Sequence, residues 1–441
     1  MNSGRSKKSQ ISAGVTLAMA LLLAACSGGN SAANSESDTG TPGQQQQQQP
    51  EKKEPVTLNI LFNGFSQERV NEVKKQVESK FPHITLNAMM ESKGNYLADV
   101  VAAGLPLDAV ARSAGGLFDA IRYGVVSDLT PYIEKHKFDL SRFAPGVLEA
   151  IKSYSGKNEI LVMPYELNNT IVTYNKAIFD KFGVEYPWDG MTWDDMFNLA
   201  QKVTRQEGGV QYKGVKLNAL NMVYRNQLGL TFVDQKTLAP TLNTDQWKRW
   251  IETMTKLYTI PGNQPASDDG FNFYNRFTLA MLIGPSPLDS LPAAVERGLD
   301  WDVVQLPHFP GMEDAGSQMN APFYAMTPTT KHKDDVFQVL AHIVSDEVQT
   351  ANSRMGRVSV LGSPEVMAEF GKDLDILKGK NVKAFYAEKI AKPIPITIYD
   401  GIARSQLSKV VDFLVGGPDD VNTALRKAEE ETARLIAEEK K

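Results

Sequence analysis

One cysteine, Cys26, constrains this chain more than any other residue, because no second thiol exists. It ends a segment that starts with Arg5, Lys7 and Lys8 and continues with mostly apolar or small residues over Ile11–Ala25. Such a segment is typical of a secretory signal peptide, and it is shorter than the roughly 20 apolar residues that span a bilayer. We therefore expect an exported protein that is held together by its core alone, without a disulfide.

The residues Leu23-Ala24-Ala25-Cys26 indicate how the exported chain is held at the membrane. They resemble the bacterial lipobox, in which residues 1–25 are removed and the cysteine receives a diacylglycerol. Each buried methylene contributes about 0.8 kcal/mol, so two or more acyl chains hold a soluble domain stably. A generic signal peptide with an incidental cysteine is the alternative. We expect a lipid anchor at Cys26.

Charge excludes one class of partner. The chain carries 47 basic and 52 acidic side chains, and removal of the three basic residues of the signal lowers the net charge from −5 to −8. A mildly acidic surface argues against binding to nucleic acid.

Residues 26–55 differ in composition from the rest. They are rich in Ser, Gly, Asn and Thr, contain the run Gln44–Gln49, and end in a charged stretch between two prolines. Because nothing there can form a core, we expect a disordered tether that gives the domain reach, with a low-complexity insert as the alternative. Folding should begin near Val56.

The first folded residues alternate between strand and helix patterns. Strands are expected at 56–61, 84–86 and 107–111, and helices at 67–80 and 115–123. Later helices are indicated by the cap at Thr192, by the apolar residues Val336, Phe337, Val339, Leu340 and Ile343, and by Val421, Leu425, Ala428 and Leu435. This alternation predicts an α/β fold with parallel strands, and about 385 residues suffice for two domains.

The motifs of common enzymes are not seen in the sequence. The five histidines are scattered without ligand spacing, and we expect no metal and no cofactor. A carboxylate pair for glycoside hydrolysis stays possible, although no spacing singles one out. Loops that combine aromatic and polar residues recur after strands, at 63–66, 165–169, 271–274 and 399–400. Such groups suit a polyol, because rings pack on sugar faces while amides and carboxylates satisfy hydroxyls.

Four stretches carry a family resemblance. They are 107–110 with 129–132, 163–165 with 173–179, 186–187 with 191–194, and 279–284 with 301–303 and 306–307. In order and spacing these stretches resemble the extracellular solute-binding proteins of ABC importers, in the sugar-binding cluster that includes the maltose-binding protein. The resemblance covers Val56–Lys441.

The resemblance implies a two-lobed periplasmic-binding-protein-like fold. Lobe 1 would comprise residues 56–168 and 309–373, and lobe 2 residues 172–304 and 375–441, with hinge-crossing segments between them. Ligand would bind in the cleft, which closes by hinge bending.

Residues of the site follow from the resemblance together with the aromatic loops. Ser286 stands where many members of the family have a tryptophan, so Tyr274 or Tyr399 would have to supply a ring. Arg112 and Arg357 have a second interpretation as ion pairs that stabilise a lobe. The expected ligand-binding residues are Asn63, Phe65, Arg112, Ser113, Tyr165, Asn168, Asn221, Tyr224, Tyr274, Ser286, Asn320, Tyr324, Arg357 and Tyr399.

These observations predict a non-enzymatic, monomeric substrate-binding lipoprotein on the outer face of the cell membrane. Its ligand would be a carbohydrate, with an oligosaccharide favoured, and its partners the transmembrane permease subunits of an ABC importer. Two alternatives stay open: an exported, lipid-anchored carbohydrate-active enzyme, and a lipoprotein that senses ligand for a membrane receptor.

Replacing Cys26 tests the expectation that this residue carries the lipid anchor. The Cys26→Ser variant has no thiol to acylate, so it should be released into the medium or remain unprocessed, while its purified domain still binds ligand. Metabolic labelling with a radioactive fatty acid measures the anchor directly. A variant that still incorporates label would show that Cys26 is not the acylated residue.

Overall fold

The computed structural model describes residues 53–313, 315–386, 389–414 and 419–441. The predicted signal peptide, Cys26 and the tether up to residue 52 lie outside the described residues. No helix in the described part has the length and apolar character needed to cross a membrane.

The first sheet is mixed and has the strand order β2-β1-β3-β10-β4. Its strands are β1 (Val56–Asn63), β2 (Ile84–Met90), β3 (Ala109–Arg112), β4 (Met163–Pro164) and β10 (Phe323–Met326). Strand β1 runs parallel to β2 and β3, as the strand–helix alternation predicts, whereas β10 lies antiparallel between β3 and β4. The parallel register pairs Asn63 with Arg112, so these two strands end at the same edge of the sheet.

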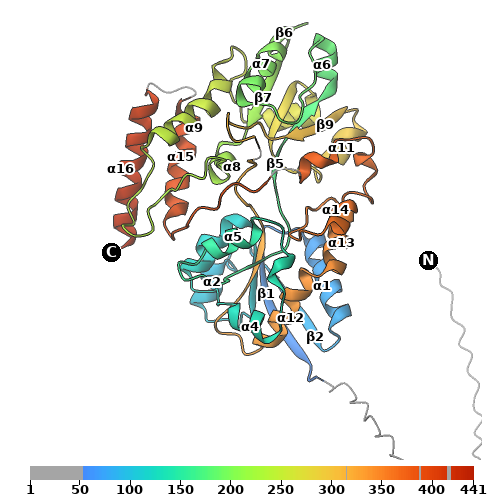
Figure 1. Ribbon diagram of the computed structural model, residues 1–441, viewed down its shortest axis with the longest axis vertical. Coiled ribbons are helices and arrows are strands. Elements are labelled where there is room, and N and C mark those ends of the chain that lie inside the picture. The colour runs from blue at the N-terminus through green and yellow to red at the C-terminus, as the bar shows by residue number, and fades with distance from the viewer. Residues whose placement is uncertain (1–52, 314, 387–388, 415–418) are drawn as a thin grey trace, which may run out of the picture. The chain divides into compact units, whose positions relative to one another are not determined.

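Helices and short turns surround the first sheet, and together they form the first lobe (Figure 1). Apolar residues from its strands and helices share one continuous core. The elements are α1 (Gln67–Lys80), α2 (Leu97–Ala102), η1 (Ala114–Gly116), α3 (Leu117–Arg122), α4 (Thr130–Lys135), η2 (Leu140–Arg142), α5 (Val147–Ser153), α12 (Lys333–Ile343), α13 (Asp346–Arg354) and α14 (Pro364–Ala368).

The second sheet has the order β6-β7-β8-β5-β9 and is covered on both faces. Its strands are β5 (Thr170–Asn175), β6 (Arg205–Glu207), β7 (Val210–Leu217), β8 (Leu279–Pro285) and β9 (Trp301–Gln305). Successive residues of a strand point to opposite faces, and accordingly Val172 joins one core while Ile171 joins another. Burial on both faces agrees with the apolar run at residues 279–283 of β8 and with the burial of every residue of β5.

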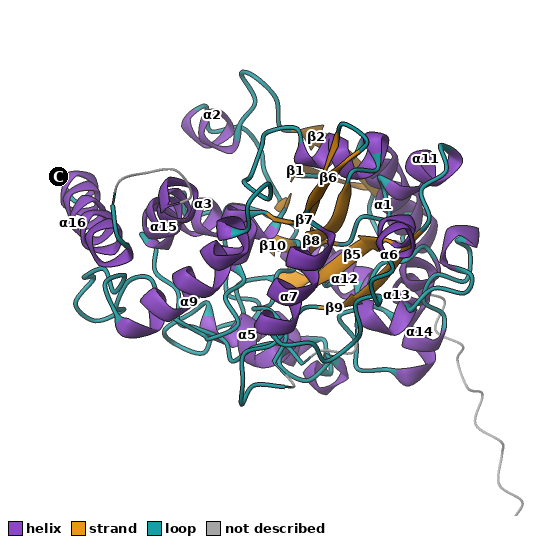
Figure 2. Cartoon of the chain, turned by 90° about the horizontal axis from the view of Figure 1, so that it is seen from above, coloured by secondary structure: helices purple, strands orange, loops and turns teal. Residues whose placement is uncertain are grey.

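The helices and turns on the second sheet complete the second lobe. Both views place α15 and α16 side by side and near α9, at one side of this lobe (Figures 1 and 2). The elements are α6 (Lys176–Phe182), α7 (Trp193–Val203), α8 (Ala219–Tyr224), α9 (Asp245–Lys256), η3 (Leu257–Thr259), α10 (Asp269–Phe271), η4 (Asn272–Arg276), α11 (Leu291–Glu296), η5 (Asp375–Leu377), η6 (Val382–Phe385), α15 (Asp400–Leu414) and α16 (Val421–Glu439).

The chain crosses between the sheets after β4, at residues 165–169, and after β9, at residues 306–322. A further connection follows α14, and Phe370 in it already packs in a core with the second sheet. The exact lobe boundaries given above stay a prediction.

The predicted α/β architecture is confirmed, with three local corrections. The predicted helix 115–123 is a short turn followed by α3, because Gly115 and Gly116 disfavour a helix. The third strand starts at Ala109, since the Asp108 carboxylate accepts hydrogen bonds from the Asn59 backbone and from Thr330. The buried face of α16 is Ala424, Leu425, Ala428, Thr432 and Ile436, while Val421 and Leu435 are only half-buried.

A test of local stability concerns the cap of α7. The Thr192 hydroxyl accepts from the Asp195 backbone at 3.1 Å, and the Asp195 carboxylate accepts from the Thr192 backbone at 2.9 Å. Loss of this capping box in Thr192→Ala should lower the free energy of unfolding by about 1 kcal/mol, measured by urea denaturation. Thr253→Ala, at a half-buried position in the middle of α9 and away from any helix cap, is the control and should change stability by less than about 0.5 kcal/mol. Equal effects of the two substitutions would contradict the role of the cap.

Candidate functional site

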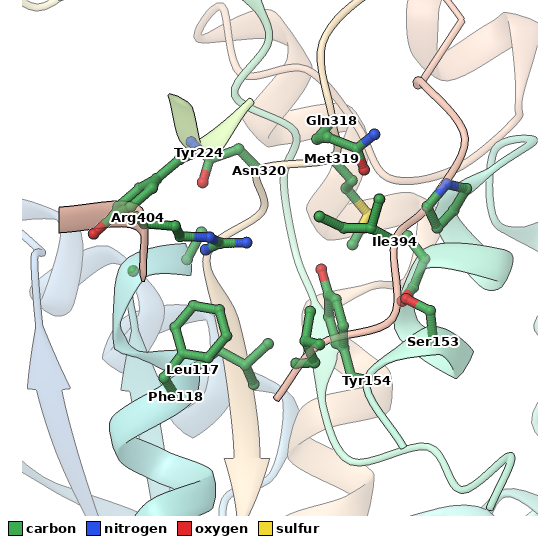
Figure 3. A pocket seen from close by; sticks show the side chains of 15 residues that line it. Leu117, Phe118, Ser153, Tyr154, Tyr224, Gln318, Met319, Asn320, Ile394 and Arg404 are labelled. Atoms are coloured by element: carbon green, nitrogen blue, oxygen red, sulfur yellow. The ribbon is translucent and has the colours of Figure 1, made fainter. Parts of the chain in front are cut away.

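A cavity lies between the two lobes, and both contribute to its walls. From the first lobe come Phe118 of α3 and Tyr154, which follows α5; from the second come Tyr224 of α8 and Arg404 of α15. Their side chains face a common space (Figure 3). Its volume of about 50 Å³ is well below the roughly 300–1,000 Å³ of typical ligand pockets. A ligand larger than a few water molecules therefore requires the lobes to move apart.

Two segments, residues 315–320 of the second crossing and residues 389–396 before α15, form a further wall of this interlobe cavity. They run side by side, with hydrogen bonds from the Gly316 nitrogen to the Lys389 oxygen (2.9 Å) and from the Ala391 nitrogen to the Ser317 oxygen (3.1 Å). The Gln318 amide adds a donor bond to the Lys392 oxygen at 2.7 Å. These bonds satisfy backbone groups that would otherwise be buried unpaired, so the wall is a defined structure.

Arg404 is the most unusual residue of the lining. Its Cζ lies 4.6 Å from the ring centre of Phe118, 4.8 Å from that of Tyr224 and 4.7 Å from that of Phe232. The ring of Phe118 belongs to the first lobe and the other two to the second, so this guanidinium bridges the lobes. Its Nε is buried without a hydrogen-bond partner, and no group in the described part of the chain accepts from its other nitrogens.

Asp400 lies one helical turn before Arg404 and is fully buried. One of its oxygens accepts from the Thr397 hydroxyl at 2.8 Å, and the other has no partner among the described residues. Burial raises the pKa of Asp400 to about 6, although the charge of Arg404 and the hydrogen bonds from Thr397 lower it. The carboxylate and the guanidinium form no ion pair within 4.0 Å in the described part of the chain.

Polar groups around the cavity are mostly neutral. Burial raises the pKa of Tyr154 to about 12, so this residue offers an un-ionised hydroxyl. Behind the lining residue Asn320 lies Arg225, which donates from Nη1 to the Thr170 hydroxyl at 3.1 Å and from Nε to the Asn320 amide oxygen at 2.9 Å. Burial lowers the pKa of Arg225 to about 10, which still leaves it charged at neutral pH. Hydroxyls, amides and rings of this kind suit a polyhydroxylated ligand.

Two predicted site residues, Tyr224 and Asn320, line this cavity. Three others, Asn168, Ser286 and Arg357, line a second cavity of about 210 Å³ beside the crossing at 165–169. There the Ser286 backbone donates to the Asn168 side chain at 3.4 Å. Arg357 donates to Glu72 at 2.9 Å, an ion pair within the first lobe of the kind that the second interpretation of this arginine expects.

The ends of β1 and β3 form a buried polar cluster. Arg112 makes an ion pair with Glu91, and both side chains are more than nine-tenths buried. Asn63 donates to the other oxygen of Glu91 at 2.6 Å, and the Ser113 backbone donates to the Asn63 oxygen at 3.1 Å. Arg112 therefore also forms the lobe-stabilising ion pair that its second interpretation expects.

The remaining predicted aromatic residues lie in cores. Phe65, Tyr165 and Tyr324 are buried against one another, with ring centres 5.5 Å apart for Phe65 and Tyr165 and 5.2 Å apart for Tyr165 and Tyr324. Tyr399 is buried in the core of the second lobe. Tyr274 packs on Phe273 at 5.1 Å in another core. None of these five rings lines the interlobe cavity, and neither does Asn221, whose backbone nitrogen bonds Asn218 at the start of α8.

Sequence reasoning missed most of the lining: Phe118, Tyr154, Gln318, Met319 and Arg404. They come from four segments that are far apart in sequence, and no spacing links them. The sequence did give one indication of Arg404. The predicted binding loop 399–400 lies at the start of α15, and Arg404 follows one turn later on that helix. No group of three or more potential metal ligands occurs in the described ranges.

Two covered sheets, crossing segments and a cavity walled by both lobes define a two-lobed binding protein. The model of the family "Bacterial extracellular solute-binding protein" matches residues 69–350, and the chain belongs to that family. The resemblance described from the sequence is thereby confirmed, and so is export from the cytoplasm, which membership of an extracellular family implies.

Solved structures share the fold. An ABC substrate-binding protein from Listeria monocytogenes in complex with cycloalternan matches with a TM-score of 0.71 and 20% identity, covering 87% of this chain and 100% of that one. The sugar-binding protein MalE from Xanthomonas citri matches with a TM-score of 0.69 and 15% identity, covering 87% and 98%. The two-lobed periplasmic-binding-protein-like fold is therefore confirmed.

Curated relatives are similar over a limited stretch. An ABC transporter extracellular-binding protein of Pyrococcus horikoshii is 29% identical over 154 residues, which is 33% of either chain. The sn-glycerol-3-phosphate-binding periplasmic protein UgpB of Brucella abortus is 27% identical over 150 residues, 32% of this chain and 34% of the relative. The matched stretch thus spans about a third of the length of these relatives.

Asp400 predicts a pH dependence of stability. Its pKa of about 6 in the fold exceeds the ordinary value of 3.8, so the folded state binds the proton more tightly. The stability it contributes is full below pH 4 and is lost as the pH rises through 6, by roughly 3 kcal/mol at about 1.36 kcal/mol per pKa unit. Asp400→Asn should remove this loss. Urea denaturation at pH 4 and pH 7 measures the difference.

Asp245→Asn, at an exposed position in the first turn of α9, is the matched control and should retain the wild-type pH dependence. An Asp400→Asn variant that loses stability between these two pH values as steeply as the wild type would refute the assignment.

Proposed function

We propose that this protein is the substrate-binding lipoprotein of an ABC importer, and that it captures a carbohydrate, with an oligosaccharide favoured, in the interlobe cavity. The lobe division given above and the lipid anchor at Cys26 are part of the proposal. Delivery would be to transmembrane permease subunits, with the protein acting as a monomer at the outer face of the membrane.

The observation that carries the proposal is the composition of a cavity built jointly by both lobes. Aromatic side chains from each lobe, Phe118, Tyr154 and Tyr224, surround it together with the amides of Gln318 and Asn320. Rings supply apolar faces for sugar rings, and the amides and hydroxyls can satisfy sugar hydroxyls. Family membership supports this assignment, as do the ligands of structural neighbours, cycloalternan among them.

A ligand in such a cavity would couple binding to lobe closure. The small volume seen here corresponds to lobes in contact, and residues 165–169 and 306–322 are the connections at which they could swing apart. A ligand that contacts both lobes binds the closed form better than the open one and shifts the population toward it. Permease subunits could then distinguish the loaded protein by its closed shape.

Hydrolysis of the ligand is the rival function, and it needs two carboxyl groups that flank the scissile bond. Among the described lining residues the charged one is Arg404, a cation that cannot act as acid or base at neutral pH. This composition favours binding without chemistry. A sensor lipoprotein would share the site and differ only in its membrane partner.

A thermal-shift screen of mono- and oligosaccharides tests the proposal. A ligand at 100 times its dissociation constant should stabilise the fold by about 2.7 kcal/mol and raise the melting temperature accordingly. Tyr154→Ala should weaken binding at least tenfold, about 1.4 kcal/mol, because a ring that faces the ligand is lost. Isothermal titration measures the dissociation constants, and product analysis at substoichiometric protein tests for hydrolysis.

The matched control is Tyr123→Ala, since Tyr123 is exposed at the end of α3 and lies outside the interlobe cavity. It should bind as the wild type does. A screen in which no sugar shifts the melt, or equal losses in both tyrosine variants, would contradict the proposed site.

A further inference from the structure

The interlobe cavity has an unbalanced charge. Of its described lining residues Arg404 alone carries a charge, and only 9% of this residue is exposed. Its guanidinium is directed into the cavity (Figure 3). A buried side chain of this kind is normally paired with a carboxylate or fully hydrogen-bonded, and here the described residues provide neither.

Contacts to aromatic rings do not satisfy this group. The three rings within 4.6–4.8 Å of Cζ stabilise the cation through their faces. A guanidinium also has five N–H donors, and at Arg404 the buried Nε is left without a hydrogen-bond partner. Arg404 is therefore held in position by packing, with its hydrogen-bonding capacity unused.

Neighbouring charges do not neutralise Arg404. Asp400 is the nearby carboxylate, but it makes no ion pair with Arg404 among the described residues, and one of its oxygens accepts from the Thr397 hydroxyl instead. Arg225 is a second buried guanidinium, and its donors go to the neutral oxygens of Thr170 and Asn320. Burial raises the pKa of the lining residue Tyr154 to about 12, so its hydroxyl carries no negative charge at neutral pH. Positive charge thus exceeds negative charge around the cavity.

The lobes are arranged so that separation would present this cation to a ligand. Phe118 covers one side of Arg404 and belongs to the first lobe, whereas Tyr224 and Phe232 belong to the second lobe together with α15. When the lobes separate, Arg404 loses Phe118 and keeps the other two rings, which hold it in place. A pre-positioned guanidinium loses little entropy on pairing with an oxyanion.

We propose that the solute bound in the interlobe cavity carries an anionic group, a carboxylate or a phosphate ester on a sugar or polyol, and that this group pairs with Arg404. The inference rests on the proposed function, since it names the class of solute for the same site. An oxyanion accepts two parallel N–H bonds from a guanidinium, and such charge-assisted pairs are roughly twice as strong as neutral hydrogen bonds.

Matched pairs of probes test this inference on the full-length protein solubilised in detergent. The carboxylate arm compares D-glucuronate with D-glucose and D-galacturonate with D-galactose; the phosphate arm compares glycerol 3-phosphate with glycerol. The anionic member of at least one pair should bind at least tenfold more tightly by isothermal titration. The arm that responds identifies the anion.

Variants assign the preference to Arg404. Arg404→Gln should reduce the preference to less than threefold, and Arg404→Lys should keep part of it because the charge remains without the planar fork. Arg426→Gln, at an exposed position of α16 where the arginine pairs with Glu430, is the control and should bind as the wild type does. Melting temperatures without ligand show whether each variant is folded. If Arg404→Gln fails to fold, the comparison of anionic with neutral probes on the wild-type protein still tests whether the solute is anionic.

The outcomes separate the two proposals. Binding of neutral sugars at least as tight as that of their acidic partners would overturn this inference and leave the proposed function intact. An anionic preference that survives in folded Arg404→Gln would overturn the role of Arg404. If no member of either arm binds while an oligosaccharide of the thermal-shift screen does, this inference is overturned and the proposed function stands; if nothing in either experiment binds, both proposals fail.

Discussion

Strand β10 imposes the constraint on which the rest of the architecture depends. It lies antiparallel between β3 and β4 in the first sheet, although the whole second sheet precedes it in the sequence. The chain must therefore leave the first lobe after β4, build the second, and return. Each passage places irregular backbone between the lobes, where its polar groups must be paired. Residues 315–318 of the returning passage meet this requirement by pairing with residues 389–392, which precede α15, and the two segments also wall the cavity.

Function in this fold depends on contacts that are divided between the lobes. Arg404 and the rings around it show the division at one residue, because Phe118 comes from one lobe and Tyr224 and Phe232 from the other. Contacts of this kind are broken by opening and restored or replaced by a ligand. The buried ion pair of Arg112 and Glu91 lies within one lobe, so lobe motion leaves it intact. It stabilises the lobe internally, whereas Arg404 lies at the interface between the lobes.

Individual helices and their caps were the features of the structure that the sequence predicted best. The helix 67–80 was predicted with its buried residues Val70, Val73 and Val77, since its apolar spacing matches the period of a helix. The cap at Thr192 was predicted because capping depends on residues three apart. Site residues were predicted poorly. Polar and aromatic residues after strands are common to binding loops and to cores, and in Phe65, Tyr165 and Tyr324 the core prevailed.

The sequence by itself determined the signal-like N-terminus with its one cysteine, the α/β class, the first strands and several helices, and the family. These features depend on neighbouring residues or on motifs in fixed order, which a chain displays without folding. Only the tertiary structure decided that Phe118, Tyr154, Tyr224 and Arg404 share a cavity, and that Arg404 makes no ion pair with a described residue there. Burial and pairing are properties of groups brought together from distant segments, and a guanidinium looks the same in sequence whether it faces water, a carboxylate or an open cavity.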